Sequence, residues 1–267
     1  MKGKKIAIIG AGNLGRSIGE GLVEKGVTNS KEITLTKRHI GSLSNLIESG
    51  FRATSNNVKA TEAADIILLC VQPNQLSEVL DEIEEHLTEE KLLISVITGV
   101  SIAQINTQLN VEVPVVRAMP NTAIAIGESM TCISSSNSKG LEITKNLFDA
   151  LGITLIIDEE LMQAATVLGA SGIAFFMRYL RAATQGGVQI GFHSEEAQLI
   201  AMQTAKGAAS LVLENHTHPE VEIDKVTTPQ GCTIEGLNEM EHKGFSSALI
   251  QGIMISYSRI TKMKKEK

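Results

Sequence analysis

Short apolar runs alternate with amphipathic stretches through the first 157 residues of the chain. The runs that predict β-strands are 6–9, 32–36, 65–71, 91–97 and 114–119, with two shorter candidates at 129–134 and 153–157. Between them, segments 16–25, 75–87, 101–109 and 137–151 repeat apolar residues at helical spacing. Because strands that alternate with helices are typical of a doubly wound, mainly parallel sheet, we predict an α/β domain.

The pattern changes after Asp158, where strand-like runs stop. Stretches rich in Ala, Met, Leu and Gln follow, and four of them predict helices at 161–168, 173–188, 194–214 and 245–261. We therefore expect a domain of residues 1–157 and a second, all-helical domain of residues 158–267. The segment 173–188 is apolar around most of its circumference, and a small helical domain has little interior to bury it. We expect this helix to pack across a homodimer interface.

A glycine-rich turn directly follows the first predicted strand. Ile6–Ile9 is apolar on both faces, as a central parallel strand is, and it runs into Gly10-Ala11-Gly12-Asn13-Leu14-Gly15. The first glycine permits a tight turn, the second lets the backbone approach a pyrophosphate, and the third lets the next helix pack against the strand. The helix N-terminus then faces the phosphates. The turn predicts a dinucleotide site in a Rossmann-type domain, although such turns also occur as plain strand-to-helix connections.

The second predicted strand ends in Thr36-Lys37-Arg38. An NAD site usually has an Asp or Glu there, which accepts a hydrogen bond from the ribose 2′-hydroxyl, whereas an NADP site has groups that bind the 2′-phosphate. No carboxylate is present in these three residues, and the planar guanidinium of Arg38 can pair with a phosphate. We therefore predict NADPH as the cofactor, with NADH as the alternative. The other interpretation is that Lys37 and Arg38 are an ordinary solvated pair.

The composition narrows the possible function classes. The 267 residues carry a net charge of −6, which gives no electrostatic case for a nucleic-acid partner. No run of about 18 uncharged apolar residues predicts a membrane span, and we find no secretory signal, so we expect a cytoplasmic protein with no membrane partner. Three widely spaced cysteines and the pair His216 and His218 form no metal-ligand pattern, and we expect no metal.

Two polar segments outside the glycine turn are rich in groups that bind small ligands. Arg117–Thr122 lies at the carboxyl end of a predicted parallel strand, where ligands bind in open α/β sheets, so we expect it to border the nicotinamide. Val226–Ile234 leads into a predicted helix, whose free N–H groups suit a carboxylate, and Thr233 adds a hydroxyl. The alternatives are a loop punctuated by Pro and Asn, and a helix cap without a ligand.

Five motifs, in matching order and spacing, resemble those of the pyrroline-5-carboxylate reductases. They are Val71-Gln72-Pro73, Arg117-Ala118-Met119-Pro120-Asn121-Thr122-Ala123, Gly169-Ala170-Ser171-Gly172-Ile173-Ala174-Phe175, Gln203-Thr204-Ala205-Lys206-Gly207-Ala208-Ala209 and Thr228-Pro229-Gln230-Gly231-Cys232-Thr233-Ile234. The resemblance covers essentially the whole chain. It implies a Rossmann domain followed by an intertwined helical dimerisation domain, in a family whose dimers often assemble into larger rings.

The resemblance also implies an activity, the NADPH-dependent reduction of 1-pyrroline-5-carboxylate to L-proline. The substrate is a small cyclic imine acid, and the reaction is the last step of proline biosynthesis. Because a protonated cyclic imine is already electrophilic, hydride transfer depends on positioning more than on a strong general base.

Site residues follow from the same resemblance. Thr233 would be the catalytic residue, with its hydroxyl near the ring nitrogen, and the N–H groups of Gly231, Cys232 and Thr233 would bind the substrate carboxylate. Asn57 would hold the adenosine phosphate end of the cofactor. The nicotinamide side would be lined by residues of two motifs, namely Val71, Gln72, Pro73, Met119 and Asn121.

Departures from the family motifs leave alternatives open. Gln72 replaces the usual Lys, and Gln230 replaces the first Gly of the final loop. If the backbone at residue 230 needs a positive φ, Gln is strained there or the loop has shifted, and either outcome could alter substrate size preference. One alternative is an NADPH-dependent reductase of another imine or keto acid. Another is a non-catalytic regulatory protein that binds NADPH.

Overall fold

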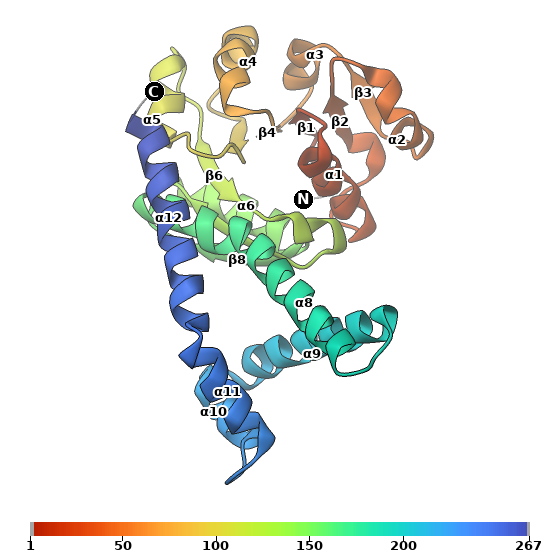
Figure 1. The fold of residues 1–267 in the computed structure, drawn as a ribbon. Helices are drawn as coiled ribbons and strands as arrows, with labels where there is room; N and C mark the ends of the chain where they lie inside the picture. Colours follow the sequence, from red (N-terminus) through yellow and green to blue (C-terminus); the bar gives the residue numbers. More distant parts are fainter. Residues whose placement is uncertain (1–2, 266–267) are drawn as a thin grey trace. The chain divides into compact units, whose positions relative to one another are not determined.

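The computed structural model describes the backbone of residues 3–265 and the side chains of residues 3–261. The chain forms two compact units (Figure 1). One runs to Ser171 and also includes the end of the last helix, from Arg259, and the other runs from Gly172 to Ser258. The first unit is α/β and the second is helical, which confirms the predicted fold class.

The first unit is built on an eight-stranded sheet in the order β3-β2-β1-β4-β5-β6-β7-β8. Neighbouring strands are parallel except for β6 and β7, which are antiparallel. The strand order reverses between β1 and β4, so a ligand is expected beyond the carboxyl ends of these two strands. The strands are β1 (Ile6–Ile9), β2 (Ile33–Thr36), β3 (Arg52–Thr54), β4 (Ile66–Leu69), β5 (Leu92–Ser95), β6 (Val115–Met119), β7 (Ser129–Ser134) and β8 (Gly152–Ile156).

Helices cover both faces of this sheet. Residues of α1, α2 and α6 share one apolar core with one side of the strands, and residues of α3, α4 and α5 share a second core with the other side. The bounds are α1 (Asn13–Glu24), α2 (Ser44–Glu48), α3 (Asn57–Glu62), α4 (Leu76–Ile83), α5 (Ile102–Gln108), α6 (Ser138–Asp149) and α7 (Met162–Ala165), which a π-helix (Thr166–Ser171) continues. Short 3-10 helices are Ser30–Glu32, Ile40–Leu43, Pro73–Gln75, Glu84–His86, Thr122–Ile126 and Glu159–Leu161.

The central strands explain why the apolar runs were recognisable in the sequence. All four residues of β1 and of β4 are buried, because helices pack on both sides of these strands. The strands and α-helices of the first unit that the pattern did not predict, β3, α2 and α3, are short and carry few buried residues.

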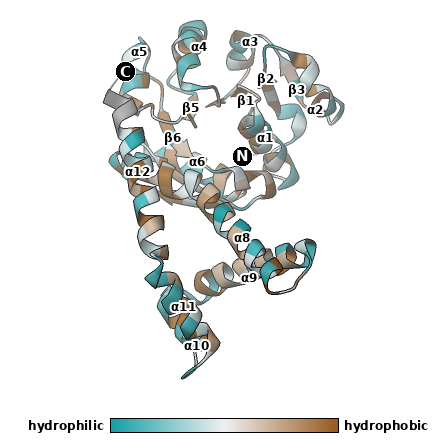
Figure 2. Ribbon diagram, viewed as in Figure 1, coloured by the Kyte–Doolittle hydropathy of each residue, from teal (hydrophilic) through white to brown (hydrophobic). Residues whose placement is uncertain are grey.

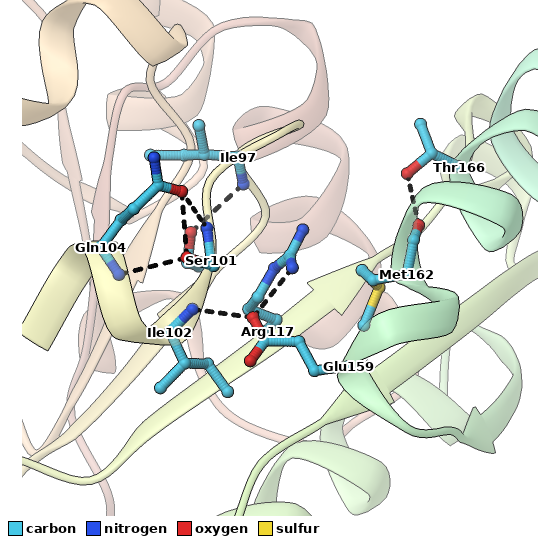
Figure 3. A network of polar contacts seen from close by, with 9 residues as sticks. Ile97, Ser101, Ile102, Gln104, Arg117, Glu159, Met162 and Thr166 are labelled. Atoms are coloured by element: carbon cyan, nitrogen blue, oxygen red, sulfur yellow. Dashed lines mark hydrogen bonds and ion pairs between the residues drawn. The ribbon is translucent and has the colours of Figure 1, made fainter. Parts of the chain in front are cut away.

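A buried ion pair joins β6 to the segment that follows the sheet (Figure 3). Arg117 is 5% exposed, and its Nη1 lies 2.9 Å from Oε1 of Glu159. The same carboxylate oxygen accepts a hydrogen bond of 2.8 Å from the N–H of Ile102, the first residue of α5. Glu159 therefore fixes the start of the post-sheet segment against both β6 and α5.

The second unit consists of α8 (Gly172–Gln189), α9 (Ser194–Asn215), α10 (Pro219–Val226), α11 (Cys232–His242) and most of α12 (Phe245–Lys265). The axes of α8 and α9 approach closely, since a Cβ added at Gly187 would lie 2.8 Å from the Cβ of Ala197. The rings of Tyr179 and Phe245 meet edge to face with their centroids 6.5 Å apart.

Large apolar side chains of the second unit are exposed within one chain. In α8, all of which the structure describes, the buried residues are Gly172 and Thr184, whereas Phe176 and Met177 are 71% and 61% exposed. Figure 2 shows apolar positions along α8 and α9. The burial expected for segment 173–188 is therefore not supplied by its own chain. An apolar surface of this kind marks an interaction site.

We predict that Glu159→Gln lowers the free energy of unfolding by about 2 kcal/mol, because it leaves the buried Arg117 guanidinium without its counter-charge. This expected loss of stability is smaller than that for a fully buried ion pair, because the Glu159 side chain is 32% exposed. Urea unfolding followed by circular dichroism measures the change. Glu160→Gln, at the exposed neighbouring residue, is the matched control and should stay within about 0.5 kcal/mol. Equal stabilities of the two variants would contradict the anchoring role of Glu159.

Candidate functional site

The glycine turn has the backbone geometry that close approach of a phosphate requires. Gly10 has φ +98°, and a Cβ there would lie 2.8 Å from the carbonyl oxygen of Cys70. A Cβ at Gly15 would lie 2.5 Å from the carbonyl oxygen of Gly10. The first turn of α1 can therefore pack this closely against the glycine turn only with glycine at residue 15. Gly12 has no atom within 4 Å of the position of an added Cβ, which leaves open space beside the N-terminus of α1. The first N–H groups of α1 have no acceptor within the helix and can bind an anion.

Thr36 ties the end of β2 to this turn. Its hydroxyl accepts a hydrogen bond of 3.3 Å from the N–H of Gly10, and its carbonyl oxygen accepts one of 2.8 Å from Ala11. Thr36 is 2% exposed, so its contribution is to hold the turn in place. Lys37 and Arg38 follow it at the surface.

A cavity of about 550 Å³ opens beside the turn. Most of the residues predicted for the cofactor line it, namely Gly10, Gly12, Thr36, Lys37, Arg38, Asn57, Val71 and Gln72. The predicted residues that do not line it are Asn13, Leu14, Gly15, Pro73, Met119 and Asn121. Its size, the open space at Gly12 and the basic residues at one end fit the adenosine and phosphate parts of a dinucleotide.

Two carboxylates of α4 also line this cavity, and the sequence analysis missed them. Glu78 lies 3.7 Å from Nη2 of Arg38, and both side chains are about three-quarters exposed. Glu82 accepts a hydrogen bond of 2.7 Å from Nδ2 of Asn57. An anion that bound Arg38 would therefore compete with Glu78. The helical pattern of 75–87 located α4, but only the fold brings this helix beside the end of β2.

Met119 and Asn121 lie at the carboxyl end of β6 and are both buried. The side chain of Asn121 donates a hydrogen bond of 3.1 Å to the carbonyl oxygen of Gly169, in the π-helix, and accepts one of 3.0 Å from Ala123. Its N–H donates to the hydroxyl of Ser129 at 3.1 Å. Asn121 thus holds the end of β6, β7 and the π-helix together.

The predicted substrate loop lies in the second unit and contains a strained turn. The N–H of Gly231 donates to the carbonyl oxygen of Thr228 at 2.9 Å, with Pro229 and Gln230 at the central positions. Gln230 has φ +58°, in the left-handed region that favours glycine. A Cβ at Gly231 would lie 2.4 Å from the hydroxyl and 3.0 Å from the carbonyl oxygen of Thr228, so a side chain here would force Thr228 to shift. The loop therefore keeps a positive φ at residue 230 and strains Gln there.

Residues 232 and 233 form the first turn of α11, three residues earlier than the sequence pattern suggested. Gly231 is the N-cap residue, and it has no side chain that could accept a hydrogen bond from the first N–H groups of α11. Both Cys232 and Thr233 are exposed, so their N–H groups and the Thr233 hydroxyl are available to a ligand. Free N–H groups at the start of a helix can bind a carboxylate.

The other two cysteines are shielded and carry neutral thiols. Burial raises the pKa of Cys70 to about 12 and also raises the pKa of Cys132. His216 adopts φ +52° at the C-cap of α9, and His218 caps α10 by accepting from the N–H of Glu220. Within the part of the chain that the structure describes, no three His, Cys, Asp or Glu residues gather as a metal site.

Two family models match the chain, one in the first part of the sheet and one in the segment that follows it. Residues 5–99 match the family described as NADP oxidoreductase, coenzyme F420-dependent. Residues 159–263 match the family described as pyrroline-5-carboxylate reductase dimerisation. With the Rossmann sheet and its glycine turn, these matches define the chain as a two-domain, NADP-dependent oxidoreductase.

Relatives match the chain over nearly its full length. Pyrroline-5-carboxylate reductase 2 of Dictyostelium discoideum is 44% identical, over 97% of this chain and 93% of the relative. The reductase of Methanosarcina acetivorans is 32% identical over the whole of both chains. Pyrroline-5-carboxylate reductase 1 of Dictyostelium discoideum is 48% identical over 98% of this chain, which spans 50% of that relative's length. The chain therefore belongs to the pyrroline-5-carboxylate reductase family.

Solved structures agree in fold. A pyrroline-5-carboxylate reductase from Coxiella burnetii superposes with a TM-score of 0.90 at 26% identity, covering 97% of this chain and 98% of that one. The pyrroline carboxylate reductase of Plasmodium falciparum, determined with NADP bound, superposes with a TM-score of 0.89 at 24% identity and covers 99% of each chain.

We predict that Arg38→Ala weakens NADPH binding at least about tenfold and leaves NADH binding unchanged, because the lost group pairs with the 2′-phosphate. Glu78→Gln should strengthen NADPH binding, since Arg38 then loses its competing carboxylate. Fluorescence titration of both cofactors at fixed ionic strength measures the dissociation constants. Arg52→Ala, at an exposed arginine outside the cavity, is the matched control. Equal losses of NADPH and NADH affinity in Arg38→Ala would contradict this assignment.

We predict that Gln230→Gly is more stable than Gln230→Ala by about 0.5–1 kcal/mol. Both variants lose the long side chain, but only Ala keeps the Cβ that is unfavourable at positive φ, and the greater flexibility of unfolded Gly offsets part of the gain. The free energy of unfolding in urea is the measurement. A glycine variant that is less stable than the alanine variant would contradict the strained turn.

Proposed function

We propose that this chain catalyses the NADPH-dependent reduction of 1-pyrroline-5-carboxylate to L-proline. The observation that carries the proposal is the cavity at the glycine turn, which fits the phosphates of NADPH, in a chain that matches pyrroline-5-carboxylate reductases along nearly its whole length. The reaction is the last step of proline biosynthesis.

The cofactor is held by residues of the first unit. The N–H groups at Gly12, Asn13, Leu14 and Gly15 bind the pyrophosphate, and Gly10 shapes the turn. Lys37 and Arg38 bind the 2′-phosphate beside Thr36, and Asn57 lies at the adenosine end. The nicotinamide side is bounded by Val71, Gln72, Pro73, Met119 and Asn121. Buried hydrogen bonds of Asn121 support this role by fixing the end of β6.

The substrate is held by the final loop in the second unit. The N–H groups of Gly231, Cys232 and Thr233 bind its carboxylate at the N-terminus of α11, where the helix dipole favours an anion. The Thr233 hydroxyl lies near the ring nitrogen and orients the imine. Exposure of residues 232 and 233 supports this assignment.

The main task of the protein in this reaction is to position the substrate. The reduced nicotinamide supplies a hydride when it is bound, and the protonated C=N bond of the substrate accepts it at carbon. The nitrogen keeps the proton and becomes the secondary amine of proline. Thr233 and the loop amides would hold the ring in one orientation, and orientation of the reacting groups supplies much of the rate of such a transfer.

The functional division of the chain follows these roles. Residues 1–157 form the NADP(H)-binding domain, and residues 158–267 form the dimerisation and substrate-binding domain. The apolar exposure of α8 and the dimerisation match over 159–263 support a homodimer, from which larger rings can be built.

We further propose a cytoplasmic enzyme with neither membrane nor nucleic-acid partner. One helical stretch, Glu159–Gln189, is long and apolar enough to span a membrane by length and composition. The sequence pattern gave no such span because Arg178 and Arg181 interrupt it. The stretch lies within the dimerisation match, so association between chains accounts for its apolar positions.

A reductase of another imine or keto acid is the second candidate. The observation that favours it is Gln230, whose strained conformation sits one residue before the proposed carboxylate-binding amides. A larger side chain at this turn can change the size of the acid that fits.

The direct test is NADPH oxidation with a panel of acids. We expect turnover with 1-pyrroline-5-carboxylate that exceeds turnover with pyrroline-2-carboxylate and with keto acids, and faster turnover with NADPH than with NADH. Higher activity on another acid would favour the second candidate. Tight NADPH binding with no turnover on any acid would favour a regulatory protein.

We predict that Thr233→Ala lowers kcat/KM for 1-pyrroline-5-carboxylate at least about tenfold, the effect of one lost oriented polar contact near 1.4 kcal/mol. Thr233→Ser keeps the hydroxyl and should keep most of the activity. Thr107→Ala is the matched control, because its exposed hydroxyl donates to the carbonyl oxygen of Ala103 within α5, outside both proposed sites. Steady-state kinetics with NADPH affinity measured separately gives the result. Unchanged kinetics in Thr233→Ala would refute the role of the hydroxyl.

A further inference from the structure

The last strand of the sheet, β8, carries an apolar face at the sheet's edge. Its parallel register with β7 places Ile153 beside Met130 and Leu155 beside Cys132. Paired residues of parallel strands project on the same side of a sheet. Ile153 and Leu155 therefore extend the sheet face that carries Met130 and Cys132.

That face is covered over β7 and bare over β8. Cys132 packs with Met119 and Met162 in a small core, and Met130, Ala165 and Ala170 lie at its margin. This cover comes from α7 and the π-helix, and Ile153 and Leu155 remain 58% and 52% exposed.

The opposite face of β8 is closed at Thr154 but open at Ile156, which is 50% exposed. Thr154 points to that side, is 7% exposed, and its N–H donates to the carboxylate of Asp149 at the end of α6. The face of Ile153 and Leu155 therefore carries two exposed apolar residues, and the opposite face carries one.

The edge also lacks the features that protect exposed strands. Residues 152–157 read Gly-Ile-Thr-Leu-Ile-Ile and contain neither a charged residue nor a proline. In the described residues, no strand pairs with the outer side of β8. Natural proteins place charges or prolines on an edge that faces solvent, so this edge is suited to contact with protein.

Continuity with the dimerisation segment indicates what covers this face. The match to the dimerisation family begins at Glu159, directly after β8 ends at Ile156, and it includes α7, which covers the neighbouring part of the same sheet face. Leu161 and Leu168, within the matched segment, are 54% and 68% exposed. The bare face of β8 therefore borders the exposed apolar surface of the segment that matches the dimerisation family.

We propose that a second copy of this chain covers Ile153 and Leu155, so that the dimer interface extends beyond the helical segment onto the edge of the nucleotide-binding sheet. The inference rests on the proposed homodimer. It has a consequence for the site, because β7 begins at Ser129, whose hydroxyl accepts from the N–H of Asn121. Association would then stabilise β8 and β7, and β7 in turn holds the end of β6.

The test compares the dimer dissociation constants of Ile153→Glu and Leu155→Glu with that of the unaltered chain, by sedimentation equilibrium over a range of protein concentrations. We expect each variant to raise the constant at least about tenfold, since a charge would be buried twice in a symmetric interface. Ile47→Glu, at a 44% exposed isoleucine of α2, is the matched control and should leave the constant unchanged. Circular dichroism and NADPH affinity check that each variant is folded.

Hydrogen exchange of the unaltered protein gives an independent measurement if a variant fails to fold. We expect the amides of residues 153–157 to be protected at high protein concentration and to exchange faster on dilution. Unaffected dissociation constants in folded variants, or exchange that does not depend on concentration, would overturn the proposal while the homodimer stands. An unaltered chain that is monomeric at all concentrations would overturn the homodimer as well.

Discussion

The absence of side chains at Gly10 and Gly15 is the constraint on which the cofactor site depends. A Cβ at either residue would overlap backbone, of Cys70 in one case and of Gly10 itself in the other. The tight turn brings the ends of β1, β2 and β4 to one place, and the hydrogen bond from Gly10 to Thr36 fixes it. Gly10, Gly12 and Thr36, which this arrangement holds together, all line the cavity.

A second set of buried polar contacts ties the far side of the sheet to the segment that begins at Glu159. Arg117 and Asn121 both lie on or just after β6, and one is bound by Glu159 and the other by the π-helix. The strand that is proposed to border the nicotinamide is therefore held by the residues that begin the dimerisation segment. The proposed nicotinamide side of the site and the segment that matches the dimerisation family therefore meet at β6 and β7.

Local patterns in the sequence predicted most of the fold, because buried strands and amphipathic helices leave periodic signals. They did not predict the Arg117–Glu159 pair or the approach of Glu78 to Arg38, since both join residues about 40 positions apart. The strain at Gln230 could be anticipated only because the reductase family has glycine at this position of its final loop. The apolar residues of 173–188 are not buried within one chain, and their packing against a partner stays a prediction.

The central claim is direct hydride transfer from NADPH to the carbon of a cyclic imine acid. Mass spectrometry of proline made from 1-pyrroline-5-carboxylate and NADPH that is dideuterated at nicotinamide carbon 4 tests it most directly. The account predicts one deuterium per proline, on the ring carbon bonded to nitrogen and distant from the carboxylate. Proline without deuterium, or cofactor oxidation without proline, would contradict it.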